Sequence, residues 1–295
     1  MNGRLRADRL ATGVLWTIAV FVVSILLAII LNFLLKSLGT LSPAFLTKDP
    51  SDTDLGGIGP LIFNSLYMLV MTLLITVPLG LLGGIYMSEY AGDGPITNAI
   101  RFCQELISSV PSIVVGLFGL AVFVTQFGWG FSALAGSFAL AVFNLPLMTR
   151  LTEQAIRAVP QDERSGSLAL GASKWQTISR VVIPIAIPGI VTGVILTSGR
   201  IFGEAAALVF TAGSSTPHSF NFGYVSLTDP LSPWSPFHTA TTMSVYIWQV
   251  NSEGLGKFVE QIANATSAVL ILSVLGFNLG ARALGRLLQR RATGA

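Results

Sequence analysis

Long apolar stretches separated by short polar segments dominate the chain. Crossing the hydrocarbon core of a bilayer takes about 20 helical residues, and six stretches approach or exceed that length. They lie at Val14–Leu35, Leu61–Tyr86, Ile107–Gln126, Phe131–Leu151, Val181–Thr211 and Thr266–Leu288. The pattern therefore predicts an all-α membrane protein with six transmembrane helices.

Three of these stretches carry further local signals. Only a short turn around Gly128–Gly130 separates the third stretch from the fourth, which predicts a helical hairpin. The fifth stretch, Val181–Thr211, is about 31 residues long, which is too long for one perpendicular span. Pro184 and Pro188 near its start predict that it begins as a cytoplasmic or interfacial segment and then kinks into the membrane.

The first stretch follows a basic segment, which raises the alternative of a cleaved signal peptide. Arg4, Arg6 and Arg9 precede the stretch. Its 22 residues exceed the usual apolar region of a signal peptide, and no clear cleavage site with small residues follows. We expect a retained membrane anchor.

Composition agrees with a membrane bundle and restricts the chemistry. Of the 295 residues, 52% are hydrophobic and 11% are charged, whereas soluble domains contain about 25% charged residues. Cys103 is the only cysteine, so neither an intrachain disulfide nor a cysteine-based metal site is expected. His218 and His238 are weak evidence for a metal, and we expect both to be ordinary loop residues. The sequence predicts no metal site.

The distribution of lysine and arginine predicts the orientation of the chain. If the N-terminus is cytoplasmic, the outer segments carry only Lys36, Lys48 and Lys257, and Arg200 lies within a helix. The thirteen basic residues of the inner segments are Arg4, Arg6, Arg9, Arg101, Arg150, Arg157, Arg164, Lys174, Arg180, Arg282, Arg286, Arg290 and Arg291. Because cytoplasmic segments are enriched in lysine and arginine, both termini are predicted to be cytoplasmic.

One charged pair lies within an apolar stretch. Arg200 is near the middle of the fifth stretch, and Glu204 follows four residues later. A charge at bilayer depth costs about 2.5–3.5 kcal/mol on insertion scales, so such residues usually mark a polar pathway. Because positions i and i+4 of a helix share a face, we expect the two side chains to meet. We interpret the pair as part of a translocation pathway; the alternative is a buried ion pair that only fixes helix packing.

The cytoplasmic segment between the fourth and fifth stretches predicts two short helices. Asp162 and Glu163 follow a proline, an arrangement that favours the first turn of a helix. Gly171 is placed to end that helix, and Lys174-Trp175 opens a second one. A short helix held out from the membrane is able to dock into a groove on a partner. These residues alone leave open the alternative of an ordinary interfacial loop.

The same segment carries a recognisable spacing. Gly171 is followed by nine residues and then by Val181-x-Ile183-Pro184. This resembles the loop signature of binding-protein-dependent ABC importer permeases, which reads E-A-A, three residues, G, nine residues, I-x-L-P. In that family the helix contacts the ATPase subunit, so the resemblance implies the same role here.

Further stretches resemble the phosphate-specific members of that family, in particular the A-type permease subunit. They are Ser109–Phe118, Leu145–Arg150 with Glu153, and Gly199–Thr211. The resemblance runs from about Asn64 to the C-terminus, and the large outer loop fits least well. Similar intramembrane arginine and glutamate residues occur in the phosphate permeases at the place of the charged pair.

The chain departs from the family pattern at one point. Where the family has E-A-A, this chain has Ser165-Gly166-Ser167, which are small residues with weaker helix preference. Glu163 could supply the charge, but it stands two residues out of register and on a different face. The residues that the resemblance implies for coupling to the ATPase are Glu163, Ser165, Gly166, Ser167, Gly171, Ala172, Lys174 and Trp175.

The resemblance also implies the domain organisation, which is that of a type I ABC importer. Residues 1–60 would form an N-terminal transmembrane anchor and an outer loop. Residues 61–295 would form the permease domain, with a cytoplasmic coupling loop near 152–180 and a large outer loop near 212–265.

The implied function is that of a permease subunit for phosphate import in a bacterial inner membrane. The chain has no Walker A sequence and is expected to need no cofactor of its own, so a partner subunit would bind and hydrolyse ATP. The implied partners are a C-type permease subunit in a heterodimer, an ATP-binding cassette ATPase dimer and an extracytoplasmic phosphate-binding protein.

Other readings of the sequence remain. The cargo could be another oxyanion such as sulfate or molybdate, or phosphonate, and the chain could be a scaffold or signalling subunit of a phosphate-sensing complex. An intramembrane enzyme is disfavoured, because Ser173 lies in the cytoplasmic loop while both histidines are predicted on the other side, so no base could reach it.

Overall fold

The regular structure of the protein is helical throughout the described part of the chain. The computed structural model describes residues 2–51, 55–92, 94–215, 220–253 and 258–293. The longer helices are α1 (Asn2–Ser37), α3 (Gly59–Ile85), α4 (Pro95–Ser109), α6 (Ala133–Arg157), α9 (Ile183–Gly203), α11 (Met243–Glu253) and α12 (Val259–Thr293). The shorter ones are α2 (Pro43–Thr47), α5 (Ser112–Gly119), α7 (Gln161–Ala169), α8 (Lys174–Thr177) and α10 (Ala206–Val209). The predicted all-α class is confirmed.

Three π-helical segments extend these helices. The segment η1 (Tyr86–Tyr90) continues α3, and η2 (Leu120–Gln126) continues α5. The segment η3 (Ile178–Val182) joins α8 to α9, so that one continuous helical run reaches from Lys174 to Gly203.

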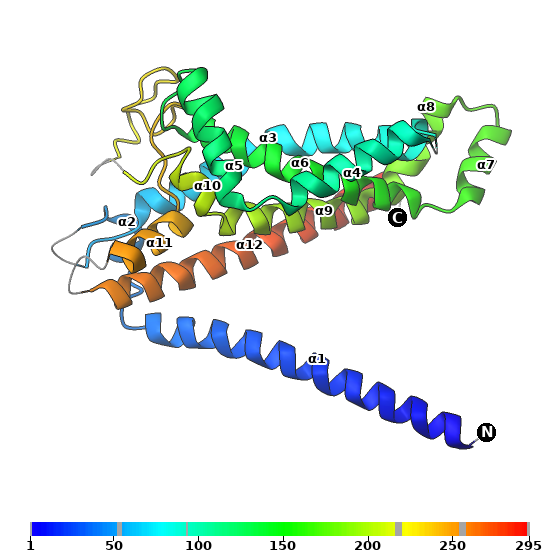
Figure 1. Ribbon diagram of the computed structural model, residues 1–295, viewed down its shortest axis with the longest axis horizontal. Helices are drawn as coiled ribbons and strands as arrows, with labels where there is room; N and C mark the ends of the chain where they lie inside the picture. Colours follow the sequence, from blue (N-terminus) through cyan, green and yellow to red (C-terminus); the bar gives the residue numbers. More distant parts are fainter. Residues whose placement is uncertain (1, 52–54, 93, 216–219, 254–257, 294–295) are drawn as a thin grey trace.

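The core of the molecule is a bundle of α3, α6, α9 and α12. Figure 1 shows these helices lying along one another, with α6 in contact with both α3 and α9, and α9 in contact with α12. Glycine allows the close approaches: a Cβ added at Gly84 would lie 2.5 Å from Cβ of Thr152, and one added at Gly189 would lie 2.6 Å from Cβ of Ala155. The bundle therefore packs through small residues, as membrane helices commonly do.

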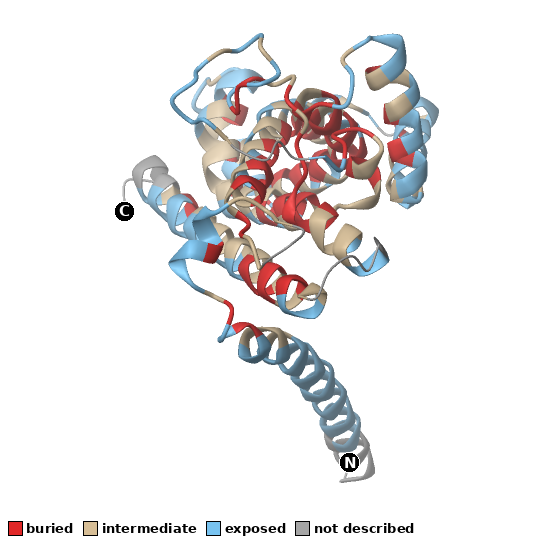
Figure 2. Cartoon of the chain, turned by 90° about the vertical axis from the view of Figure 1, so that its left-hand side faces the viewer, coloured by how far each residue is buried: buried red, intermediate tan, exposed pale blue. Residues whose placement is uncertain are grey.

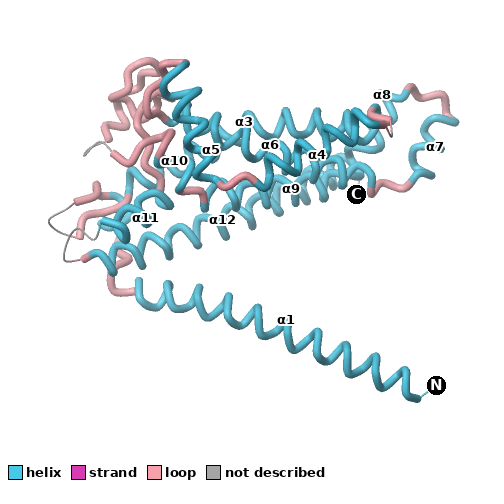
Figure 3. Tube along the Cα trace, in the orientation of Figure 1, coloured by secondary structure: helices cyan, strands magenta, loops and turns pink. Residues whose placement is uncertain are grey.

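The two ends of the bundle differ. One end, here called the α7 end, carries α7, α8, the beginning of α1 and the last turns of α12 (Figure 1). The opposite end, here called the loop end, carries α2, α11 and the long loop between α10 and α11, as the loop colouring of Figure 3 shows. The chain therefore begins and ends at the same end as the predicted docking helix.

Helix α1 stands apart from the bundle. It contacts α12 and diverges from it toward the α7 end (Figures 1 and 2). Lys36 and Glu260 form an ion pair of 3.0 Å where the two helices meet, but both side chains are exposed, and such pairs contribute little stability. The most apolar 18 residues of α1, within Leu10–Ser37, include none that is buried within the chain, so their side chains are available to lipid or to another subunit.

The third predicted span is wrong as a single helix. In place of one helix over Ile107–Gln126, α4 ends at Ser109, and the pair formed by Pro95–Ser109 and Ser112–Gln126 is bent by 96°. Val110 is extended (ψ 132°) and Pro111 follows it with ψ 136°. Proline disfavours the helical conformation of the residue before it, which explains the break. The segment is a broken span or a re-entrant loop, and the other five predicted spans each correspond to a long apolar helix.

The predicted hairpin is present, and the fifth span ends earlier than predicted. The segment α5–η2 does return through the turn at Gly128–Gly130 into α6, and both glycines have positive φ, so this hairpin is confirmed. The fifth span ends at Gly203 rather than near Thr211, because Glu204 is extended (ψ 120°) and the short helix α10 follows it.

The long loop at the loop end is tied to α3 by buried polar contacts. His238 is fully buried, and its Nε2 lies 3.0 Å from Oδ1 of Asn64 on α3. The amide of Asn64 also donates to the carbonyl of Thr241 over 3.0 Å. His238 is therefore a structural residue, while His218 and Lys257 lie outside the described residues.

Candidate translocation site and docking helix

Arg200 contacts an aromatic ring in the interior of the bundle. It lies in the last turn of α9 and is half-buried, and its Cζ is 3.7 Å from the centroid of the Phe143 ring on α6. A guanidinium over an aromatic face gains about 0.5–2 kcal/mol. Among the described residues, no carboxylate oxygen lies within the 4.0 Å of an ion pair from Arg200. The sequence placed this charge in an apolar stretch that the structure shows as part of a candidate membrane span, but its aromatic partner on another helix was not visible there.

Glu204 does not meet Arg200, so the expected contact on a shared helical face is wrong. The helix ends at Gly203 before it reaches Glu204, and the Oε1 of Glu204 instead accepts a hydrogen bond of 3.3 Å from the backbone N–H of Ala207 in α10. The carbonyl of Glu204 accepts a bond of 2.7 Å from Ser244 on α11. The glutamate therefore fixes the turn between α9 and α10.

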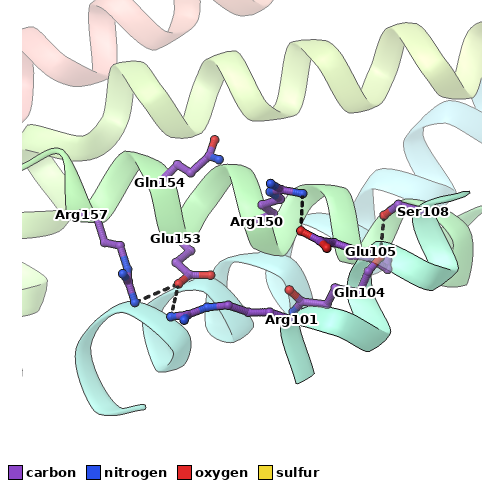
Figure 4. A pocket seen from close by; sticks show the side chains of 9 residues that line it. Arg101, Gln104, Glu105, Ser108, Arg150, Glu153, Gln154 and Arg157 are labelled. Atoms are coloured by element: carbon purple, nitrogen blue, oxygen red, sulfur yellow. Dashed lines mark hydrogen bonds and ion pairs between the residues drawn. The ribbon is translucent and has the colours of Figure 1, made fainter. Parts of the chain in front are cut away.

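A charged cavity lies between α4 and α6, toward the α7 end. Its volume is about 220 Å³, and Figure 4 shows the polar side chains that reach into it from the two helices. The lining residues are Arg101, Gln104, Glu105 and Ser108 from α4, and Pro146, Arg150, Glu153, Gln154 and Arg157 from α6. Three arginines face two glutamates here, so the lining has one net positive charge.

The two glutamates of this cavity have different roles. Glu153 is buried to 9% side-chain exposure and lies 3.0 Å from Arg101 and 3.1 Å from Arg157. Arg150 and Glu105 are 3.3 Å apart, but their side chains are 54% and 60% exposed. Since exposed pairs contribute about 0–1 kcal/mol, Arg150 is the cation that an entering anion could take from its partner.

The cavity and Arg200 lie along one face of α6. Phe143, Pro146, Arg150, Glu153 and Arg157 recur at intervals of three or four residues, which places them on the same side of the helix. Phe143 and Arg150 are seven residues apart, or about 10 Å along an α-helix. Sequence analysis counted Arg101, Arg150 and Arg157 as inner charges and used Arg150 and Glu153 for their resemblance, but it did not place them in one site. The i, i+3, i+7 spacing along α6 was the available signal.

The predicted docking helix is present and projects from the bundle. Helix α7 has Asp162 and Glu163 in its first turn and no buried residue. Gly171 follows it with a φ of +85°, a conformation that favours glycine. The next helix, α8, starts at Lys174 with a capping box in which Ser173 and Gln176 exchange bonds with each other's backbone. Both short helices are thus where the sequence predicted them.

Most of the residues named for coupling are accessible on this segment. Glu163, Ser165, Gly166, Gly171, Lys174 and Trp175 are exposed, while Ser167 and Ala172 are half-buried. Leu170 is 91% exposed and Trp175 is 55% exposed, so two large apolar side chains face outward. Ser167 donates to or accepts from Thr177 over 2.9 Å, which gives one residue of the Ser165-Gly166-Ser167 departure a contact within the segment.

Glu89 attaches the docking helix to the bundle. Its carboxylate pairs with Arg164 of α7, and both side chains are nearly buried, at 10% and 13% exposure. Arg164 also donates to the carbonyl of Ile156 over 2.6 Å. Lys174 donates to the carbonyl of Glu89 and lies 4.6 Å from the centroid of the Tyr90 ring. Sequence reasoning missed Glu89, because 75 residues separate it from Arg164.

Among the described residues, no three His, Cys, Asp or Glu side chains gather in a way that could hold a metal ion.

Comparison with known proteins places these features in a family. A family model described as "Binding-protein-dependent transport system inner membrane component" matches residues 77–294. The probable ABC transporter permease protein YqgI of Bacillus subtilis (strain 168) is 48% identical over 294 residues, which cover 99% of each chain. The phosphate transport system permease protein PstA of Pasteurella multocida (strain Pm70) is 33% identical over 236 residues, covering 76% of this chain and 84% of that protein.

Solved structures show the same fold. A chain from the crystal structure of a bacterial alginate ABC transporter, in complex with an alginate pentasaccharide-bound periplasmic protein, aligns with a TM-score of 0.66 and 16% identity. The alignment covers 97% of this chain and 96% of that one. An inward-facing form of the MetNI methionine ABC transporter aligns with a TM-score of 0.56 and 16% identity over 79% of this chain and 94% of that one.

Proposed function

The chain belongs to the family of binding-protein-dependent transport system inner membrane components, and from that premise we propose that it is the permease subunit of an ATP-driven phosphate importer. The observation that carries the proposal is the position of Arg200. It is a guanidinium on a membrane-spanning helix that contacts the ring of Phe143 and forms no ion pair among the described residues. A cation at this location that is not held in an ion pair is available to a passing anion.

The chemistry of the guanidinium suits phosphate. Its planar donors match pairs of oxyanion oxygens. The contact with Phe143 is weak enough to be exchanged for such a ligand. Guanidinium does not by itself separate phosphate from sulfate or molybdate, so the choice of phosphate rests on the PstA relatives, of which one is 33% identical and another, from Mycobacterium leprae (strain TN), is 35% identical.

Release of the anion requires competition for the arginine. Glu204 is the carboxylate nearest to Arg200 in the sequence, but it accepts a hydrogen bond from α10. Glu105 is better placed to compete at Arg150, about 10 Å further along α6 from the ring that holds Arg200. An anion that leaves Arg200 would reach Arg150, and Glu105 would take Arg150 back as the anion departs toward the α7 end.

Energy for the cycle would come from a separate ATPase dimer. The exposed side chains of Leu170 and Trp175 on the docking segment provide apolar contacts for that partner. A second permease subunit of C type would complete the pathway, and an extracytoplasmic phosphate-binding protein would deliver the anion at the loop end. The α7 end, where Figure 1 places both chain ends, would then face the cytoplasm of a bacterial cell.

The test is uptake of labelled phosphate in cells that lack this chain. Wild type should restore ATP- and binding-protein-dependent uptake, Arg200→Gln should not, and both should be present in the membrane at equal levels. The matched control is Arg290→Gln, which removes an exposed positive charge near the end of α12, outside the coupling loop, and should transport normally.

The remaining outcomes separate the alternatives. Rescue by both wild type and Arg200→Gln would reduce Arg200 to a packing residue. If wild type fails to restore phosphate uptake, the same cells are tested with sulfate, molybdate and phosphonate. An assembled complex that transports none of these would favour a scaffold or signalling subunit.

A further inference from the structure

A second basic groove lies between α9 and α12. Its volume is about 460 Å³. The α9 wall is mainly apolar, with Val191 and Leu196 on either side of Thr192, and the α12 wall carries Arg282 and Arg286 one helical turn apart. Gly285 forms the floor, because a Cβ there would lie 2.8 Å from both methyl groups of Val191. The groove is therefore a joint of two membrane-spanning helices that combines a hydrocarbon wall with two cations.

The two arginines mark the point at which α12 stops being apolar. From Gln261 to Ala281 the helix has no Asp, Glu, Lys or Arg. These 21 residues rise about 30 Å, which equals the thickness of a bilayer core. Arg282 is thus expected at the level of the lipid headgroups. Because Arg282 and Arg286 follow this stretch, they lie on the side of the α7 end.

Neither arginine of the groove has an acidic partner. No carboxylate of the described residues lies within 4.0 Å of Arg282 or Arg286. Nε of Arg286 donates to the carbonyl of Arg282 over 3.4 Å, which leaves its terminal nitrogens to other ligands. Both side chains are exposed. Two neighbouring cations without a counter-charge at the membrane surface attract an anionic headgroup.

The groove is separate from the proposed anion pathway. The α9 residues that face α6 include Gly189 and Gly193, as their contacts with Ala155 and Leu151 show. The groove is lined by Val191 and Ile195, which stand two positions beyond these glycines and therefore lie on another side of α9. An anion on the Arg200–Arg150 route would therefore not pass through it.

We propose that this groove binds an anionic phospholipid from the leaflet at the α7 end. The lipid phosphate lies on Arg282 and Arg286, and an acyl chain lies along Val191 and Leu196. A free phosphate ion would gain nothing from the apolar wall, whereas a phospholipid uses both halves of the groove. The lipid then fills the joint between α9 and α12 from the outside. This inference needs only the membrane location of the chain and does not rest on phosphate as cargo.

The proposal is tested by native mass spectrometry of the full-length chain, purified in a mild detergent and titrated with phosphatidylglycerol or phosphatidylcholine. Wild type should retain phosphatidylglycerol preferentially. The double variant Arg282→Gln/Arg286→Gln should lose at least about tenfold in affinity for it, since each basic residue near an anionic surface contributes about 1 kcal/mol and 1.4 kcal/mol is tenfold. The matched control, Lys48→Gln/Arg180→Gln, removes two exposed positive charges elsewhere and should bind as wild type.

Two further variants separate the halves of the site. Arg282→Lys/Arg286→Lys keeps the charge and should keep most of the preference for phosphatidylglycerol. Thr192→Trp fills the groove while it leaves both arginines in place, and it should also lose the lipid. Equal phosphatidylglycerol binding by wild type and the Arg→Gln double variant would overturn the proposal. Displacement of the lipid by inorganic phosphate at millimolar concentration would also overturn it.

Discussion

The attachment of the docking helix through Glu89 makes a quantitative prediction. Helix α7 buries none of its own residues, so its position depends on a few polar contacts. The main one is the ion pair between Arg164 and Glu89, whose side chains are 13% and 10% exposed. Removing one partner of a pair that is this well buried costs about 3–5 kcal/mol, because the remaining charge is left without compensation. The hydrogen bond between Ser167 and Thr177 adds only about 1 kcal/mol.

We therefore expect Glu89→Gln to release α7 while the rest of the fold stays intact. The buried cluster beneath it, which includes Ile85, Ile156 and Ile178, does not include the Glu89 side chain. The cost appears as local opening of α7, and 3 kcal/mol corresponds to at least about 100-fold faster amide hydrogen exchange. The measurement is hydrogen–deuterium exchange of peptides that cover α7 in the purified chain, compared with peptides from α6.

Two controls make the result interpretable. Glu163→Gln changes an exposed carboxylate in the first turn of the same helix and should leave α7 exchange unchanged. The charge-reversed pair Glu89→Arg/Arg164→Glu should recover a large part of the protection. If α7 in Glu89→Gln exchanged within about twofold of wild type, the ion pair would not hold the helix, and the reasoning from burial would be refuted.

Further predictions concern packing, helix preference and the charged cavity. Gly84→Ala should destabilise the chain by about 1–3 kcal/mol in thermal unfolding, because the new Cβ meets α6 at 2.5 Å; Gly280→Ala, with no atom within 4 Å of the new Cβ, should be tolerated. Gly166→Ala, which also meets no atom within 4 Å, should stabilise α7 by about 0.5–1 kcal/mol and slow its amide exchange. Glu153→Gln should lower thermal stability strongly, since it leaves two arginines facing one another without their carboxylate. Arg150→Gln, at an exposed pair, should leave stability unchanged but reduce phosphate uptake.

Six apolar stretches were predicted to form transmembrane helices, and five of them form long apolar helices. The break in the third stretch was not predicted. A proline stands inside α3, α6 and α9, at Pro78, Pro146 and Pro188, and each of these helices continues through it. Pro111 alone ends a helix in mid-stretch. What distinguishes it is tertiary: a Cβ added at Gly116 would lie 2.9 Å from Cα of Ala207, so α5 is packed closely on α10 in its bent direction. Sequence periodicity contains no information about that contact.

The parts of the site that depend on residues close together in the sequence could be predicted, and the contacts between distant residues could not. The two docking helices follow from a proline, two acidic residues and Gly171, all within a few positions of the elements they delimit. The partner of Arg200 was assigned to Glu204 by helical spacing, and that assignment failed because the helix stops one residue too early. Arg200 instead contacts Phe143, which is far from it in the chain. The cavity is likewise formed by distant residues, such as Arg101 and Glu153, which are 52 positions apart.

The surroundings of the arginines at the α7 end explain why two nearby basic sites would serve different anions. Leu151, next to Arg150 on α6, lies against Gly193 of α9, and Gly285, shortly after Arg282 on α12, lies against Val191 of α9. Arg150 and Arg282 therefore lie at a similar height along α9. Arg150 has Glu105 within 3.3 Å, whereas no described carboxylate reaches Arg282. A cation with a competing carboxylate holds an anion weakly and lets it go, which suits a transported ion. At Arg282 no described carboxylate competes and an apolar wall lies beside the cation, which suits a lipid that remains part of the folded protein. The competing carboxylate and the apolar wall therefore distinguish these two sites, and adding a carboxylate beside Arg282 should weaken lipid retention there.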